Sequence, residues 1–109
     1  MTETYRVLSQ TALSATTLTD CYTVGASTSA AVSSVVICNR AATDTTFRVA
    51  IAVAGAVDNV KQYLYYDTPV SANNSFVATI GITLATTDVV RVYTAGSSVS
   101  VSTLGVEVQ

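Results

Sequence analysis

The chain has 109 residues, of which 50% are hydrophobic and 11% are charged, with a net charge of −2 and no histidine. This length holds one domain with a single core, and the charged fraction is less than half of the roughly 25% that is typical of soluble domains. The five basic residues are scattered singly, which excludes the clustered phosphate contacts of a nucleic-acid-binding protein.

The first predicted strand covers Tyr5 to Ser9, where residues alternate with a period of two. Residues 10–20 are rich in threonine, and the spacing of Leu13 and Leu18 fits no regular period. We therefore interpret residues 10–20 as an arm or loop that places both leucines against something else, such as another subunit. On this basis Leu13 and Leu18 are candidate interface residues.

The two cysteines lie in the next two predicted strands, Cys21 to Val24 and Val32 to Asn39. The strand Val32 to Asn39 is apolar on both faces, which is typical of a covered strand. Two cysteines without a histidine make neither a zinc site nor a thiol protease dyad. A disulfide between Cys21 and Cys38 requires neighbouring strands. We favour free thiols, because cysteine is often buried as a small hydrophobe.

The clearest period of two in the chain runs from Thr46 to Ala54. It predicts a half-buried strand that forms a hairpin with Val32 to Asn39. A further strand is expected from Gln62 to Tyr66. A short helix over Val57 to Leu64 is the less favoured alternative, because no capping residue with a matching stop supports it.

Three tyrosines lie in the predicted strand from Gln62 to Tyr66. Side chains alternate between the two faces of a strand, so Tyr63 and Tyr65 are expected on one face and Leu64 and Tyr66 on the other. One pair is then in the core, and the other is an exposed pair on a surface with little charge. Such residues are enriched in protein interfaces and in sugar-stacking sites. Tyr63, Tyr65 and Tyr66 are candidate interface residues, and contact within a homo-oligomer is favoured over carbohydrate binding.

The longest alternating strand is predicted from Phe76 to Leu84, and Gly81 within it marks a bulge or a close backbone approach. Another strand follows after a turn. In the last segment the apolar residues change parity between Val101 and Leu104. This change predicts a bulge around Ser102-Thr103.

Short strands separated by turns, without a convincing helix or an internal repeat, predict an all-β fold. We expect an antiparallel β-sandwich of seven to eight short strands, as one domain over residues 1–109. Jelly-roll and Ig-like topologies both remain open. The predicted core residues are Phe47, Ile51, Ile80, Ile82, Val90 and Val92.

The composition offers little chemistry for catalysis. Without histidine the usual general base and the commonest metal ligand are missing, and the acidic residues fall singly, mostly in turns, where they bond to the backbone. The serines lack a base, and no glycine-rich phosphate loop occurs, so we expect no enzyme, metal or cofactor. No apolar run approaches the ~18 residues of a membrane span, and the N-terminus shows no secretory signal. We expect no membrane partner and synthesis in a cytoplasm.

Several short sequence motifs follow one another in the C-terminal part of the chain. They are Lys61 to Val70 (KQYLYYDTPV), Ala72 to Phe76 (ANNSF), Gly81 to Ala85 (GITLA), Asp88 to Tyr93 (DVVRVY) and Leu104 to Glu107 (LGVE). In these motifs the chain resembles a small β module that recurs in structural proteins of tailed bacteriophages. The likeness covers the C-terminal half to two thirds, and the N-terminal third departs from the pattern, which leaves the docking surface unassigned.

The resemblance implies a non-enzymatic virion component, and it carries over no catalytic residue. Such modules look like capsid decoration (cement) proteins, neck or tail fibres, or pieces of adhesins. Decoration proteins bridge capsomers, commonly as trimers, and a surface with little charge favours this role here. We therefore expect a homotrimer that binds the major capsid protein and resides in the virion after synthesis in the host cytoplasm. A neck or tail fibre component is the alternative.

Overall fold

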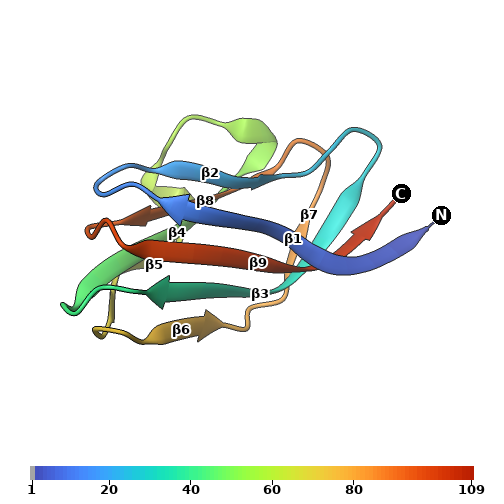
Figure 1. The fold of residues 1–109 in the computed structure, drawn as a ribbon. Helices are drawn as coiled ribbons and strands as arrows, with labels where there is room; N and C mark the ends of the chain where they lie inside the picture. The colour runs from blue at the N-terminus through green and yellow to red at the C-terminus, as the bar shows by residue number, and fades with distance from the viewer. Residues whose placement is uncertain (1) are drawn as a thin grey trace.

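The structure is a computed structural model that describes residues 2–109. Within these residues the chain forms nine strands and two single-turn 3-10 helices, and all strand pairs are antiparallel (Figure 1). The strands are β1 (Glu3–Leu13), β2 (Thr19–Thr23), β3 (Ser29–Asn39), β4 (Thr45–Ala52), β5 (Tyr63–Val70), β6 (Ser75–Ala78), β7 (Ile82–Leu84), β8 (Val89–Thr94) and β9 (Val99–Val108). The helical turns are η1 (Val53–Gly55) and η2 (Val60–Gln62).

The strands form two sheets that pack face to face, which confirms the predicted antiparallel β-sandwich. The five-stranded sheet has the order β1-β9-β3-β6, with β7 also paired to β3, and the four-stranded sheet has the order β2-β8-β4-β5. Strands β6 and β7 lie one after the other along β3, so together they fill one strand position. Eight positions in this order are a jelly roll, which decides between the two topologies left open by the sequence.

The core lies between the sheets and is built from the inward-facing residues of regular strands. Six core residues were predicted by alternation, and all six are in or against the apolar cluster. Phe47, Val90 and Val92 are completely buried, and Ile51, Ile80 and Ile82 are partly buried and pack against them. For the four predicted residues in β4 and β8 the prediction succeeds because these strands pair without a register shift, so the period of two is preserved.

The arm predicted for residues 10–20 is wrong. Strand β1 continues to Leu13, which is only 4% exposed and pairs with Val99, while β2 begins at Thr19. Only residues 14–18 form a connection, and Thr16 N in that connection donates to Thr94 O at 2.8 Å. The period was hidden because β1 shifts register between Val7 and Ser9, and such a bulge moves the following side chains to the opposite face.

The bulge predicted within the last strand is also in a different place. Strand β9 pairs without a break of its own, and the irregularities lie in its neighbours, between Val7 and Ser9 of β1 and between Val32 and Ser34 of β3. The apolar side chains of Leu104 and of alternate residues after it therefore lie on the outer face of the sheet. The predicted bulge is misplaced because the alternation of apolar residues was interpreted as burial, whereas part of the outer face of this sheet is itself apolar.

Three irregularities lie side by side across the five-stranded sheet. They are the shifts in β1 and β3 and the break between β6 and β7, where Gly81 has a φ of +52°. Bulges bend and twist a sheet, and the sheet is therefore bent along the line of these three irregularities. We call this line the crease. Beyond it, both ends of the chain curve away side by side (Figure 1), and Thr2 N donates to Gln109 O at 2.7 Å.

The bent end beyond the crease is attached to the four-stranded sheet by polar contacts. Tyr22 of β2 donates its hydroxyl hydrogen to Glu107 Oε2 of β9, and Arg6 Nη2 lies 2.8 Å from Glu107 Oε1. The side chain of Glu107 is only 12% exposed. Burial, together with the hydrogen bond to Glu107, raises the pKa of Tyr22 above its usual value.

Candidate functional site

The tyrosine strand β5 does not follow the alternation expected for it. Its pairing with β4 shifts register on either side of Val49, so the faces change within the strand. The Tyr65 ring turns inward, with its centroid 5.8 Å from that of Phe47. Tyr63 and Tyr66 instead contact each other, edge to face, with centroids 5.1 Å apart. The predicted pairing of Tyr63 with Tyr65 is wrong because a register shift lies between these two residues, and such a bulge places their side chains on opposite faces.

A layered cluster on the outer face of the four-stranded sheet includes the two outer tyrosines. The Arg48 guanidinium lies 4.1 Å from the ring centroid of Tyr66 and 4.4 Å from that of Tyr93. Arg48 Nε also lies 2.7 Å from Asp67 Oδ1, and this hydrogen bond raises the pKa of the guanidinium. We call Tyr63, Tyr66, Tyr93, Arg48 and Asp67 the tyrosine surface.

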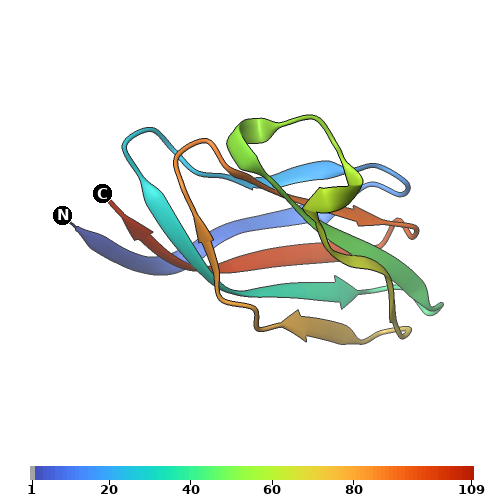
Figure 2. The ribbon, with the colours of Figure 1, turned by 180° about the vertical axis from the view of Figure 1, so that it is seen from behind.

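Residues 53–62, here called the valine loop, connect β4 to β5 across the outer face of the four-stranded sheet (Figure 2). The sheet fixes the loop from below: Asp88 Oδ1 accepts a hydrogen bond from Ala54 N at 2.9 Å, and Arg91 Nη1 donates to Ala56 O at 2.7 Å. The valine side chains nevertheless project into solvent. Val53 is 67% exposed, and Val57 and Val60 are each 87% exposed.

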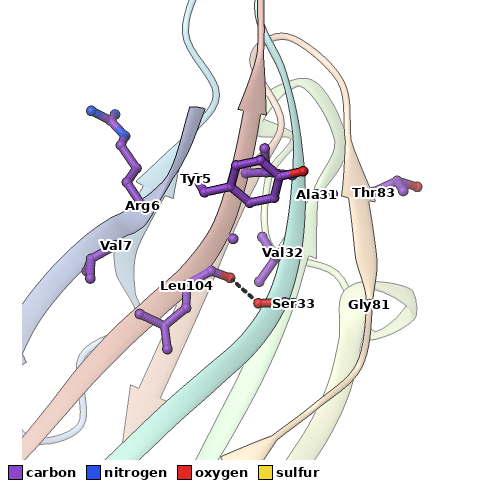
Figure 3. A pocket seen from close by; sticks show the side chains of 11 residues that line it. Tyr5, Arg6, Val7, Ala31, Val32, Ser33, Gly81, Thr83 and Leu104 are labelled. Atoms are coloured by element: carbon purple, nitrogen blue, oxygen red, sulfur yellow. Dashed lines mark hydrogen bonds between the residues drawn. The ribbon is translucent and has the colours of Figure 1, made fainter. Parts of the chain in front are cut away.

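A second apolar surface lies on the outer face of the five-stranded sheet, at the crease. It is a hollow of about 520 Å³, shown in Figure 3, into which the Tyr5 ring extends from β1. It is lined by Tyr5, Arg6, Val7, Ala31, Val32, Ser33, Gly81, Thr83, Leu104, Gly105 and Val106. Arg6 points away from the hollow in Figure 3, so the accessible lining is mostly apolar.

Two glycines shape this hollow. A Cβ on Gly81 would have no other atom within 4 Å, so this position borders open space. A Cβ on Gly105 would lie 2.1 Å from Ala31 O, so β9 and β3 approach too closely there for a larger residue. The hollow thus follows from the crease and from the missing side chains at it.

The structure separates the five predicted interface residues. Tyr66 is 57% exposed and Tyr63 is half-buried beside it, whereas Tyr65 and Leu13 pack in or against the core and Leu18 is half-buried before β2. Sequence reasoning missed the valine loop and the hollow. The sequence contained a sign of each surface. Val53, Val57 and Val60 follow no regular spacing on either side of Gly55, and in β9 some of the residues that alternate with the buried ones, such as Leu104, are also apolar.

Among residues 2–109, no group of three or more His, Cys, Asp or Glu side chains is placed to hold a metal ion. Cys21 and Cys38 are free thiols in different sheets, and burial raises the pKa of Cys21 to about 11. No helix found in residues 2–109 has the length and apolar character required to cross a membrane.

Comparison of the chain with protein-family models, with curated proteins and with solved structures gave no match. The resemblance to phage modules thus rests on the short sequence motifs between Lys61 and Glu107 alone. The surfaces described above have to be interpreted from their own geometry and chemistry.

Proposed function

We propose that this protein is a non-enzymatic structural subunit of a tailed-phage virion, and that it decorates the capsid, where it bridges and stabilises capsomers. One observation carries the proposal: two apolar surfaces, the valine loop and the hollow, are uncovered on opposite faces of one small sandwich. Monomeric soluble proteins rarely expose extended apolar patches, which mark interaction sites. An assembly subunit that contacts several neighbours, copies of itself included, needs such surfaces on more than one side.

Fold and composition support the same role. Jelly rolls occur in viral capsid and lectin domains, although this is an analogy of fold and not of site. The charged fraction of 11% suits a surface that neighbours cover. We propose self-association as a trimer, the major capsid protein as partner and the virion as location, with no nucleic-acid or membrane partner.

The test is to find the protein in virions of the phage that encodes it. Heads and tails are separated and analysed by mass spectrometry, and purified protein is added to heads that lack it for electron cryo-microscopy and thermal denaturation. Decoration predicts the protein in the head fraction, ordered density on the capsid surface and a higher melting temperature of the head. Presence in tails with absence from heads would contradict it.

A neck or tail fibre component, with a carbohydrate-binding tyrosine surface, is the second candidate. Tyr66 is 57% exposed, and Asp58, which accepts a hydrogen bond from the adjoining Tyr63, offers a polar group of the kind that binds sugar hydroxyls. A glycan array would compare the wild-type protein with Tyr66→Ala. Tyr65→Ala is unsuitable, because Tyr65 packs against the core. If the wild-type protein binds no glycan, this candidate is removed.

A further inference from the structure

We infer that copies of this protein associate head to tail, with the valine loop of one copy inserted into the hollow of the next. The inference deepens the self-association that belongs to the proposed function, and it rests on that part of it. It concerns one occupant for both apolar surfaces, namely a second copy of the same chain.

The valine loop has the properties of an inserting segment. Val57 and Val60 are each 87% exposed, so almost all of their apolar surface is available to be buried by a partner. The loop is held by the Asp88 and Arg91 contacts and, within itself, by Gln62 Nε2, which donates to Val57 O at 2.9 Å. A loop that is already ordered loses little conformational entropy when it binds.

The hollow has the properties of a receiving surface. Its volume of about 520 Å³ is bounded by Tyr5, which is 78% exposed, and by Val7, which is 50% exposed. Both side chains lie on the bent end, which the contacts of Glu107 hold in place. The hollow therefore offers apolar area on a fixed backbone, as the preformed pockets of protein interfaces do.

Each surface has an exposed charged side chain outside the ion pairs, and the two charges are opposite in sign. Within residues 2–109, Lys61 of the valine loop takes part in none of the three ion pairs. Glu3, next to the hollow on β1, is likewise outside them, and its carboxylate accepts only from Tyr5 Oη, at 3.2 Å. Arg6 is already paired with Glu107 in its own copy, whereas Asp58 of the loop, like Glu3, accepts only a tyrosine hydroxyl, that of Tyr63. A Lys61 to Glu3 contact between copies fixes the direction of docking.

The placement of the surfaces determines the kind of assembly. The loop lies over the four-stranded sheet (Figure 2), and the hollow is lined by residues of the five-stranded sheet, so the two face in different directions. A contact between two different patches is heterologous, and it generates a closed ring or an open string. One repeated self-contact then covers both apolar surfaces of each copy, whereas foreign partners would have to supply two different complements.

The experiment measures mass in solution by light scattering for the wild type and for three variants. Val57→Asp with Val60→Asp disables the loop, Val7→Asp disables the hollow, and Val77→Asp, at an exposed valine outside both surfaces, is the matched control. We expect the wild type and the control to associate. The loop variant and the hollow variant should each have the monomer mass of 11.3 kDa.

Mixing gives the decisive result. An equimolar mixture of the loop variant and the hollow variant retains one intact contact per pair, so it should form a dimer of about twice the monomer mass and nothing larger. A monomeric wild type, a mixture that stays monomeric or a control that also dissociates would each overturn the inference. Circular dichroism confirms that every variant is folded.

The charge contact is tested in the same way. Lys61→Glu and Glu3→Lys should each weaken association several-fold, and the combined exchange should restore it because the attraction is reversed and not lost. No restoration would overturn the Lys61 to Glu3 contact. The head-binding experiment above is independent of these masses, so failure of the virion role and failure of the head-to-tail contact are distinguished.

Discussion

The two ends of the sandwich, on either side of the crease, are held together by different forces. On the regular side apolar residues from both sheets fill the interior, and Phe47, Val92 and Val101 are at most 1% exposed. On the bent side Glu107 joins the sheets through Tyr22 and Arg6. Apolar burial depends on area and packing, whereas the polar contacts depend on distance, geometry and protonation. One small domain therefore has one end sensitive to lost volume and one end sensitive to lost hydrogen bonds and to pH.

The largest effect is expected on the regular side, from Phe47→Ala. Phe47 is completely buried, and its ring packs against Phe76 and Tyr65 with centroids 5.0 and 5.8 Å away. Removing a buried ring costs about 3–5 kcal/mol of the free energy of unfolding, which urea denaturation measures. The control Val57→Ala, at an 87% exposed position, should stay within about 0.5 kcal/mol of wild type. Equal costs for the two variants would refute the core assignment.

A smaller effect is expected at the crease, from Gly105→Ala. The added Cβ would meet Ala31 O at 2.1 Å, and a backbone atom of a paired strand moves only if the sheet moves. Overpacking of this kind costs about 1–3 kcal/mol. Gly25→Ala is the matched control, because its Cβ has Thr28 Oγ1 as nearest neighbour at an ordinary 3.8 Å. If both glycine variants melt at the wild-type temperature, β9 and β3 do not approach as described.

A still smaller effect is expected at the bent end, from Tyr22→Phe. The change removes the hydrogen bond to Glu107 and leaves Glu107 paired with Arg6, so it should cost about 1–2 kcal/mol. Tyr5→Phe, at a residue that is 78% exposed, serves as control and should cost almost nothing. A Tyr22→Phe protein as stable as its control would show that the bent end is held by packing alone.

The same tyrosine predicts how stability depends on pH. Its pKa is raised in the folded state, first by burial and then by Glu107, so above the ordinary tyrosine pKa of about 10 the unfolded chain loses this proton and the folded chain keeps it. Tyr22 therefore contributes full stability below about pH 10, and the contribution declines as pH rises, by up to about 1.4 kcal/mol per pH unit. The free energy of unfolding, measured by urea denaturation at several pH values above about 10, should fall less steeply with pH for Tyr22→Phe than for the wild type.

The contrast between the two ends also marks how far the sequence could predict the structure. Where strands are regular, a period of two placed Phe47 and Val92 correctly in the core. Where a bulge occurs, as beside Leu8 or Tyr65, the same period placed the following side chains on the wrong face. A bulge is a property of a strand pair, and one strand read alone does not contain it.

The interaction surfaces were harder to predict than the core for a related reason. Patterns locate apolar residues that are buried, and the change of parity at Leu104 therefore predicts a bulge in β9. In the structure Leu104 remains on the outer face, beside the hollow. The exposed valines of residues 53–62 have no period at all, so only the arrangement of the loop on the sheet reveals them.

The smallest expected effect on stability, but a clear chemical one, comes from the cysteines. Cys21 is buried between the sheets, and burial raises the pKa of its thiol to about 11, whereas Cys38 is half-buried in the five-stranded sheet. A disulfide reagent at pH 8 should therefore modify Cys38 in the folded protein and reach Cys21 only on unfolding, because the thiolate is the reactive form. Cys38→Ser should abolish the fast reaction, and Cys21→Ser should leave it unchanged. If Cys21 reacts as fast as Cys38 in the native protein, the regular side of the sandwich opens to solvent and its apolar interior does not exclude the reagent.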